Sequence, residues 1–420
     1  MERIDRTQSI DIVAPEDVGM SAKTLSLIDE FVMNGIKGLS YRGAVVLIAR
    51  HGTICHFKPY GDDGKDRPMQ TDAVFRQASM TKPIVMAAFM QFYEQGRFTL
   101  EDPLSQYLPE FDDLKVATDD GSGNITLVPA NRAITMHDLM SYSAGFSCTF
   151  YYGADPVNSF VTKRYVEQGV HDLFHDAYTH TLEDNVKALA QCPLAFQPGA
   201  GWLYAHTSHD IIGYLIEQFS GMTLDNYLKQ SIFTPLKMTE SWFYPPEDVF
   251  SRIPQATIMH NADAPFVESV LGLLPENQEY TFSKNRSYFS AGGGLHSTAY
   301  DYFRFAQMML NRGELDGERI LAPATVDLMT QPTADRFKIS GLTGNMWGYG
   351  VDVQVSDTPG GSGLWLGGKG SYGWRGIWST LWNNNPANDT VAMIFTQVGD
   401  DGAFPYVYLL NTFTSAAVLD

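Results

Sequence analysis

The opening part of the chain carries three clear patterns of apolar and polar positions. Ser21 precedes AKTLSLIDEFVMNGI, whose apolar residues recur at helical spacing, so we expect a helix capped by Ser21. The segment GAVVLIARHGTICHFKPYG predicts two strands joined at His51-Gly52. The run MTKPIVMAAFMQFYEQG is apolar on nearly every face and ends at Gly96, which predicts a buried helix with Ser79 at its amino end.

Beyond this helix the pattern changes twice. Residues from about 100 to 285 combine helical patterns such as DIIGYLIEQFSG with Pro- and Gly-bearing loops, and show little strand-like alternation. SAGGGLHSTAYDYFRFAQMMLNRG then predicts a Gly turn before a helix that begins near Ser297, and WSTLWNNNPANDTVAMIFTQ returns to strand patterns. We therefore expect an α/β (α+β) fold in which residues 1–80 and 285–420 build one sheet domain and residues 81–284 form a mainly helical inserted domain.

Composition and charge narrow the class of protein. A chain of 420 residues with 44% hydrophobic residues can bury a large core, which indicates an ordinary globular protein. The formal net charge of −19 repels phosphate backbones and anionic membranes, so we expect neither nucleic-acid nor membrane partners. The opening residues lack a basic segment followed by an apolar stretch, which favours a cytoplasmic location. Cys55, Cys148 and Cys192 lie far apart without ligand spacing and are expected to be buried thiols rather than disulfides or zinc ligands.

One tetrapeptide is a candidate for catalysis. Ser79-Met80-Thr81-Lys82 is the single Ser-x-x-Lys of the chain, and residues three apart share a face of a helix, so hydroxyl and amine can meet. An amine buried at the start of an apolar helix is desolvated, and desolvation lowers an amine's pKa toward the range in which it accepts a proton. The helix amino end also offers N–H groups, including that of Ser79, to a developing oxyanion. The alternative is a surface helix start with a solvated lysine.

Other reactive patterns are weaker. SYSAG at residues 141–145 resembles the end of a Gly-x-Ser-x-Gly elbow, but Ser141 stands where the first glycine belongs. The histidines form no HExxH pattern, and His206 and His209 are the one close pair near the candidate chemistry. We favour the interpretation without a metal, and we expect no cofactor.

Longer stretches around these residues resemble the serine β-lactamase and penicillin-binding-protein superfamily, in particular its family VIII carboxylesterases. The resemblance spans most of the chain and runs through FRQASMTKPIVMAAFMQFYEQGRFTLEDPLSQYLPEF, ITMHDLMSYSAGF, FQPGAGWLYAHTSHDIIGYLIEQFSG and SAGGGLHSTAYDYFRFAQMMLNRG. It implies a β-lactamase-like fold: an antiparallel sheet flanked by helices, a mainly helical domain beside it, and the active site in the cleft between them.

The resemblance also implies roles for three residues. Ser79 is then the acylated nucleophile and Lys82 its neighbouring base, while Tyr204 in GWLYAH takes the position of the tyrosine in the family's Tyr-x-Asn motif. Serine is a weak nucleophile at neutral pH, and a lysine with a phenol can relay its proton when each holds the other's pKa near neutrality. Which of Lys82 and Tyr204 takes the proton first stays open, because strongly coupled groups titrate as a pair.

A third motif lies near the carboxyl end. WRG in YGWRGI resembles the Trp-x-Gly of esterase members, which stands in place of the lactamase Lys-Thr-Gly. By this alignment the backbone N–H of Ile377 joins that of Ser79 as the second oxyanion donor, and Trp374 and Gly376 contact the substrate. KGS at residues 369–371 is a rival for the Lys-Thr-Gly position.

Two departures from the family concern the substrate. His206 stands where the family has an asparagine that binds the amide of a lactam side chain, and Trp374 stands where lactamases carry a cation for the drug's carboxylate. A bulky indole favours apolar acyl or alcohol groups, so both changes disfavour β-lactams, and His206 is expected to bind substrate. SGN at residues 122–124 imitates the Ser-x-Asn of other lactamase classes but sits in a polar Gly-rich turn.

Together these residues predict a serine carboxylesterase that cleaves small-molecule esters through an acyl-enzyme. Alternatives that use the same site are an amidase, a D-peptidase, a weak β-lactamase, or an acyltransferase that passes the acyl group to an alcohol instead of water. A catalytically silent or penicillin-sensing scaffold predicts a missing catalytic member, whereas this chain keeps all three. The sequence indicates no oligomeric state.

Overall fold

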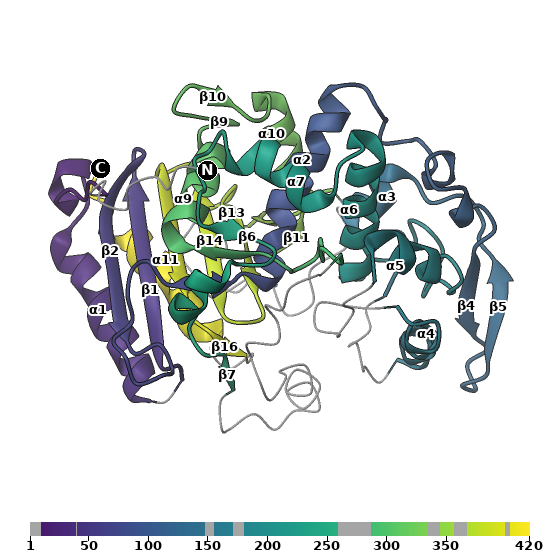
Figure 1. Cartoon of the computed structure of the whole chain (residues 1–420), viewed down its shortest axis with the longest axis horizontal. Coiled ribbons are helices and arrows are strands. Elements are labelled where there is room, and N and C mark those ends of the chain that lie inside the picture. Colours follow the sequence, from purple (N-terminus) through teal and green to yellow (C-terminus); the bar gives the residue numbers. More distant parts are fainter. Residues whose placement is uncertain are drawn as a thin grey trace.

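The computed structural model describes residues 10–38, 40–147, 155–170, 180–258, 287–333, 345–356, 368–399 and 404–420. Figure 1 shows a large sheet with its helices on the left and a group of helices on the right. This is the α/β arrangement expected from the sequence.

A seven-stranded antiparallel sheet is built from both ends of the chain, as predicted. Its strand order is β11-β12-β13-β14-β15-β1-β2, so the first strand lies beside one of the last. The strands are β1 (Gly43–Arg50), β2 (Thr53–Gly61), β11 (Asn345–Trp347), β12 (Asp352–Gln354), β13 (Tyr372–Gly376), β14 (Thr380–Asn385) and β15 (Thr390–Phe395). The turn predicted at His51-Gly52 joins β1 to β2, and both of its residues have positive φ, as a two-residue hairpin turn requires.

β1 is buried along its whole length because helices cover both faces of the sheet. Its side chains alternate, so that Val45 and Leu47 join one hydrophobic core while Val46 and Ile48 join another. The first core is shared with α9 (Ala299–Leu310), and the second with α1 (Ala22–Lys37) and α11 (Phe404–Ala417). Ser21 caps α1 as predicted, accepting from the N–H of Thr24 at 3.1 Å.

The inserted region is mainly helical, as predicted. Its helices are α2 (Thr81–Glu94), α3 (Met136–Ser141), α4 (Pro156–Glu167), α5 (Leu182–Leu189), α6 (His206–Ser220) and α7 (Leu224–Leu228), followed by the π-helical turn η5 (Lys229–Phe233). α2 packs against α6, and Phe89 of α2 stacks on Phe98 and Phe219 with ring centroids 4.6 and 6.2 Å apart. α2 is therefore the buried helix that its apolar sequence indicates.

A hairpin in this region was not predicted. β4 (Lys115–Asp119) and β5 (Ile125–Pro129) pair antiparallel at the right edge of Figure 1. Most of their side chains are partly or fully exposed, so the strands lack the apolar alternation by which sequence reveals a strand. The turn interpretation of residues 122–124 is confirmed: they lie at the exposed hairpin tip, where Asp119 accepts from the N–H of Gly123 at 2.9 Å.

A small sheet joins the inserted region to the carboxyl part of the chain. Its strand order is β3-β8-β6, with β3 (Val74–Arg76), β8 (His296–Thr298) and β6 (Ser241–Trp242). The helix predicted to begin near Ser297 begins instead at Ala299, because residues up to Thr298 belong to β8 and the Thr298 hydroxyl caps α9. The domain boundaries at 80 and 285 stay a prediction.

Shorter elements complete the described part of the chain. They are η1 (Pro15–Val18), η3 (Leu104–Gln106), η4 (Pro109–Phe111), η6 (Glu247–Arg252), β7 (Thr257–Ile258) paired with β16 (Val398–Gly399), the hairpin of β9 (Glu314–Leu315) with β10 (Glu318–Arg319), and α10 (Pro323–Met329). Cys55 and Cys192 are buried free thiols, as predicted, and Cys148 lies outside the described residues. Among the described helices, none is both long and apolar enough to cross a membrane.

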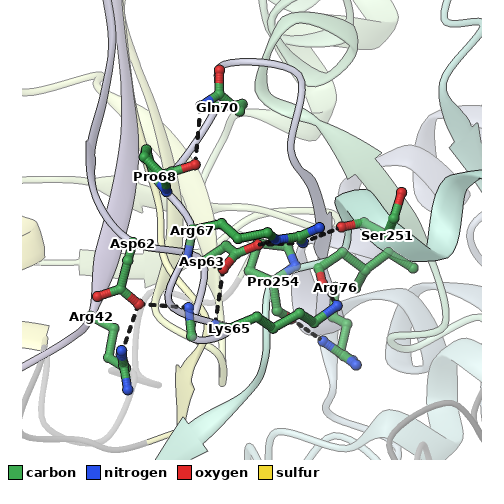
Figure 2. A network of polar contacts seen from close by, with 12 residues as sticks. Arg42, Asp62, Asp63, Lys65, Arg67, Pro68, Gln70, Arg76, Ser251 and Pro254 are labelled. Carbon is green, nitrogen blue, oxygen red and sulfur yellow. Dashed lines mark hydrogen bonds and ion pairs between the residues drawn. The ribbon is translucent and has the colours of Figure 1, made fainter.

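Polar contacts fasten the strand that leads to Ser79. Arg76, the last residue of β3, donates from Nη1 to the carbonyl of Pro254 at 2.9 Å (Figure 2) and to Oε1 of Gln397 at 3.2 Å. Gln397 donates back from Nε2 to the carbonyl of Arg76 at 3.3 Å. Burial lowers the pKa of Arg76 to about 10, so the guanidinium stays charged at neutral pH.

A second part of this network holds the loop after β2. In Figure 2, Arg67 donates to Asp63 Oδ2 and to the carbonyl of Ser251, both at 2.5 Å. Ser251 lies in η6, so the loop and this helical turn are tied together. These hydrogen bonds hold both β3, which leads to Ser79, and the loop that precedes it.

Candidate active site

Ser79 lies in a tight turn directly before α2. The turn is η2 (Ala78–Met80), and Ser79 is 8% exposed. Ala78 has a φ of +45°, a left-handed conformation that costs a residue with a Cβ roughly 1–3 kcal/mol. Such a conformation persists where the surrounding structure imposes it. Here it accompanies the tight turn that places Ser79 at the amino end of α2. The predicted position of Ser79 is thereby confirmed.

Lys82 is fully buried beside Ser79. Its Nζ donates to Ser79 Oγ at 3.2 Å, donates to the carbonyl of Gly292, and lies 2.8 Å from Nδ1 of His206. The alternative of a solvated lysine is therefore wrong. A neutral amine has two N–H groups and one lone pair. When Lys82 is neutral and its two hydrogens are directed to Gly292 and His206, the lone pair faces Ser79, and the hydroxyl of Ser79 becomes the donor in this contact.

His206 is the first residue of α6 and reaches Lys82 from the opposite helix. Burial, and then the charge of Lys82 and the neighbouring His209, hold the pKa of His206 well below its usual value. The imidazole is thus neutral, and its Nδ1 accepts from Lys82 in the tautomer that carries the hydrogen on Nε2. Sequence reasoning gave His206 a place in the substrate site and missed this contact; substrate binding by His206 stays a prediction.

Tyr204 stands two residues before His206, as the resemblance implies, and its ring lies close to the lysine. Lys82 Nζ is 4.9 Å from the centroid of the Tyr204 ring. The hydroxyl oxygen of Tyr204 accepts from Nε1 of Trp374 at 3.2 Å. The structure therefore brings together Ser79 from the turn before α2, Lys82 and Tyr204 from the inserted region, and Trp374 from the large sheet.

The end of β13 lies against the Ser79 turn. A Cβ on Gly376 would lie 2.4 Å from the carbonyl oxygen of Gln77, so only glycine fits here without a shift of the backbone. Thr380 Oγ1 donates to the same oxygen at 3.3 Å. Within the described part of the chain, no protein acceptor is bonded to the N–H of Ser79 or of Ile377. Both groups are free to bind an oxyanion, and that role stays a prediction.

Aromatic side chains pack together in a cluster that includes Tyr204. Tyr142 lies with its ring centroid 5.2 Å from Tyr204 and 4.9 Å from Trp347, and Trp347 lies 4.6 Å from Trp374. The hydroxyl of Tyr142 is 2.8 Å from Nδ1 of His209. Sequence reasoning missed Tyr142 and Trp347. Tyr142 lies inside LMSYSAGF, a segment that carries the resemblance, whereas no motif pointed to Trp347.

The rival motifs lie elsewhere. Lys369 of the KGS segment is exposed in the turn before β13, while Trp374 and Gly376 face Tyr204 and the Ser79 turn. His206 and His209 direct their Nδ1 atoms at Lys82 and Tyr142 rather than at a shared point. WRG therefore lies at the candidate site, and its assignment as the family's Trp-x-Gly motif stays a prediction.

A separate cavity of about 530 Å³ lies between η5 and β6. Aromatic residues contribute to its lining, among them Trp242, Phe243 and Phe289. Neither Ser79 nor Lys82 nor Tyr204 borders it. It is distinct from the candidate site.

The antiparallel sheet, the helical region beside it and a serine-lysine pair at the head of a buried helix define a serine enzyme of the β-lactamase-like fold, a class that works through an acyl-enzyme. Comparison with known proteins agrees. The Beta-lactamase family model matches residues 28–408, so the chain belongs to the Beta-lactamase family.

Three similar proteins illustrate the breadth of this family. Protein Rv1367c of Mycobacterium tuberculosis is 31% identical over 371 residues, which cover 84% of this chain and 85% of that protein. Esterase EstB of Burkholderia gladioli is 28% identical over 374 residues, covering 86% and 87%. Among solved structures, EstCE1, described as a hydrolase with promiscuous acyltransferase activity, has a TM-score of 0.74 at 24% identity and covers 95% of this chain and 99% of its own. This last likeness concerns the fold.

Proposed function

We propose that this protein is a serine carboxylesterase that hydrolyses small carboxylic esters through an acyl-enzyme on Ser79. The observation that carries the proposal is the 3.2 Å contact of Lys82 Nζ with Ser79 Oγ, made by a buried amine whose other contacts named above are a neutral imidazole and a carbonyl. The similarity to Esterase EstB supports ester hydrolysis as the reaction.

The proposed reaction begins with removal of the hydroxyl hydrogen of Ser79 by Lys82, assisted by Tyr204. Oγ then attacks the ester carbonyl carbon, and the resulting oxyanion accepts from the N–H groups of Ser79 and Ile377. Removing one such donor typically costs about 3 kcal/mol of transition-state stabilisation. Tyr204 gives its own proton to the leaving alcohol and regains one from Lys82. Water then attacks the acyl carbon and gives a proton to the same pair, which returns it to Oγ of Ser79 as the free acid leaves.

The surroundings favour an ester with apolar groups over a β-lactam. Trp374 is 6% exposed and packs against Tyr204 and Trp347, so an indole stands where lactamases present a cation. An indole gives apolar contact but no charge-assisted bond to a carboxylate. We infer small neutral acyl and alcohol groups as the substrate class.

The test compares hydrolysis of nitrophenyl acetate and butyrate by the wild type and Ser79→Ala. We expect the variant to lose activity by roughly a thousandfold or more. An unchanged rate in Ser79→Ala refutes the assignment. Nitrocefin and D-alanyl amides, assayed in parallel, overturn the ester preference if they are cleaved faster.

A second candidate is acyl transfer to an alcohol, since the same acyl-enzyme serves both reactions. Acyltransferase mokF of Monascus pilosus, 25% identical over 337 residues, favours this candidate. Product analysis with an added alcohol separates the two: a new ester indicates transfer, and the free acid alone indicates hydrolysis.

A further inference from the structure

A buried carboxylate on α6 has no role in the mechanism above. Asp210 lies one turn after His206 on the same face of the helix and is 2% exposed. It accepts from Asn185 Nδ2 at 2.9 Å, from the hydroxyl of Tyr288 at 2.5 Å and from the N–H of Ala291 at 3.1 Å. Such a fully bonded carboxylate fixes the segments that donate to it.

The last of these bonds leads to the catalytic lysine. Ala291 directly precedes Gly292, whose carbonyl accepts from Lys82 Nζ. Gly292 is also pressed against α6, because a Cβ on it would lie 2.8 Å from His206 Nδ1 and 3.2 Å from the His206 carbonyl. The backbone of Ala291 and Gly292 is therefore held between Asp210, His206 and Lys82.

The charge of Asp210 is a second link between this residue and Lys82. Burial raises the pKa of Asp210 to about 7, while its hydrogen bonds and the charge of Lys82 oppose this rise. The two charges therefore attract, and an ionised Asp210 favours the ammonium that Lys82 becomes on accepting a proton. Of the other titratable groups that face this region, His206 and His209 have pKa values well below their usual range and stay neutral.

We propose that Asp210 is a positioning residue for the reaction: it holds the backbone at Ala291, so that the carbonyl of the next residue, Gly292, orients the amine of Lys82, and its charge stabilises the protonated amine. The inference rests on the proposed role of Lys82 as the base for Ser79. Asp210 itself touches neither Ser79 nor the reacting atoms in this proposal.

Asp301 offers a matched control. It is also buried, accepts from the N–H of Glu240 at 2.6 Å and from Ser241 Oγ at 2.9 Å, and has its pKa raised to about 7 by burial. Its hydrogen bonds hold the segment before β6 rather than the peptide at Lys82. If activity falls merely because an amide replaces a buried carboxylate, Asp210→Asn and Asp301→Asn should lose similar amounts of activity.

The experiment measures kcat, KM and the pH dependence of kcat/KM for nitrophenyl butyrate in the wild type, Asp210→Asn and Asp301→Asn. For Asp210→Asn we expect kcat to fall by about 10- to 100-fold with little change in KM. We also expect the acidic limb of the profile to move to lower pH by roughly half a unit to one unit. Asp301→Asn should keep the wild-type kcat and profile.

Two outcomes overturn the proposal: an unshifted profile in Asp210→Asn, or parallel losses of activity and melting temperature in both variants. If Asp210→Asn does not fold, Tyr288→Phe removes one bond to Asp210 and keeps the charge. It should lower kcat without moving the acidic limb, and a wild-type kcat then counts against the positioning role. An active Ser79→Ala variant, by contrast, refutes the proposed function itself.

Discussion

The indole N–H of Trp374 donates to the hydroxyl oxygen of Tyr204 over 3.2 Å. Because this oxygen accepts from Trp374, the hydrogen of the phenol is left for a different acceptor. Trp374 thus contacts Tyr204, the tyrosine of the proposed proton relay, in addition to the substrate contact that the sequence predicts. This relationship explains why a tryptophan, rather than any large apolar residue, suits the position.

Trp374→Phe tests this contact. The ring remains but the donor is lost, so we expect kcat to fall about tenfold, the effect of one hydrogen bond of roughly 1.4 kcal/mol, with KM nearly unchanged. Trp382 provides the control, since it pairs with Trp374 between β13 and β14, belongs to the other hydrophobic core, and donates to Asn384 at 2.8 Å. Trp382→Phe should lower the melting temperature and leave kcat intact. Equal kcat losses in the two variants contradict the role of Trp374.

His206 should be replaceable by a residue that keeps an acceptor. In His206→Asn the amide oxygen can still accept from Lys82. In His206→Leu the side chain at this position offers no acceptor. We expect the asparagine variant to retain activity within about tenfold and the leucine variant to lose about a hundredfold or more. Steady-state kinetics with nitrophenyl butyrate decides, and similar activity in both variants refutes the orienting role of the imidazole.

Gly376 should not tolerate a methyl group. In Gly376→Ala the new Cβ would meet the carbonyl oxygen of Gln77 at 2.4 Å, which pushes the end of β13 away from the Ser79 turn. We expect kcat to fall by about a hundredfold as the Ile377 N–H leaves its position. Gly38→Ala, at the end of α1 with its nearest neighbour at 3.2 Å, is the control and should keep full activity. Full activity in Gly376→Ala excludes this close approach.

Asp301 links stability to pH. Burial raises its pKa from the usual 3.8 to about 7. Between about pH 4 and pH 7 the folded chain therefore keeps a proton that the unfolded chain has released. Its contribution to the free energy of unfolding falls as pH rises through this window and is constant above it. The melting temperature of Asp301→Asn minus that of the wild type should accordingly increase from pH 4 to pH 7. A constant difference over this range contradicts the raised pKa.

Local patterns in the sequence predicted most of the sheet and the helix that follows Ser79. β1 is apolar because both of its faces are covered, and α2 is apolar because it lies inside the helical region. α11 was missed, since FPYVYLLNTFTSAA is apolar nearly throughout and shows no helical periodicity. The β4–β5 hairpin was missed for the opposite reason, because its strands are too exposed to alternate.

In the candidate site, too, the sequence predicted contacts between nearby residues but not those between distant ones. Ser79 and Lys82 are three residues apart, so the sequence alone can place them together. The contact of Lys82 with His206 joins residues 124 positions apart, and that of Trp374 with Tyr204 joins residues 170 positions apart. Contacts of this kind depend on how helices and strands pack, and no local pattern encodes them. Only the family resemblance drew attention to Tyr204 and Trp374.

The position of β1 beside β15 bears on how the chain is made. During synthesis Val45 leaves the ribosome long before its partner Phe395, so one edge of β1 stays open until nearly the whole protein has emerged. A nascent chain that already carries Ser79 and Lys82 still lacks the strand that presents Trp374 and Ile377. On the proposed mechanism, activity therefore requires the last strands to be in place, and until then β1 keeps an unpaired edge that can associate with other chains.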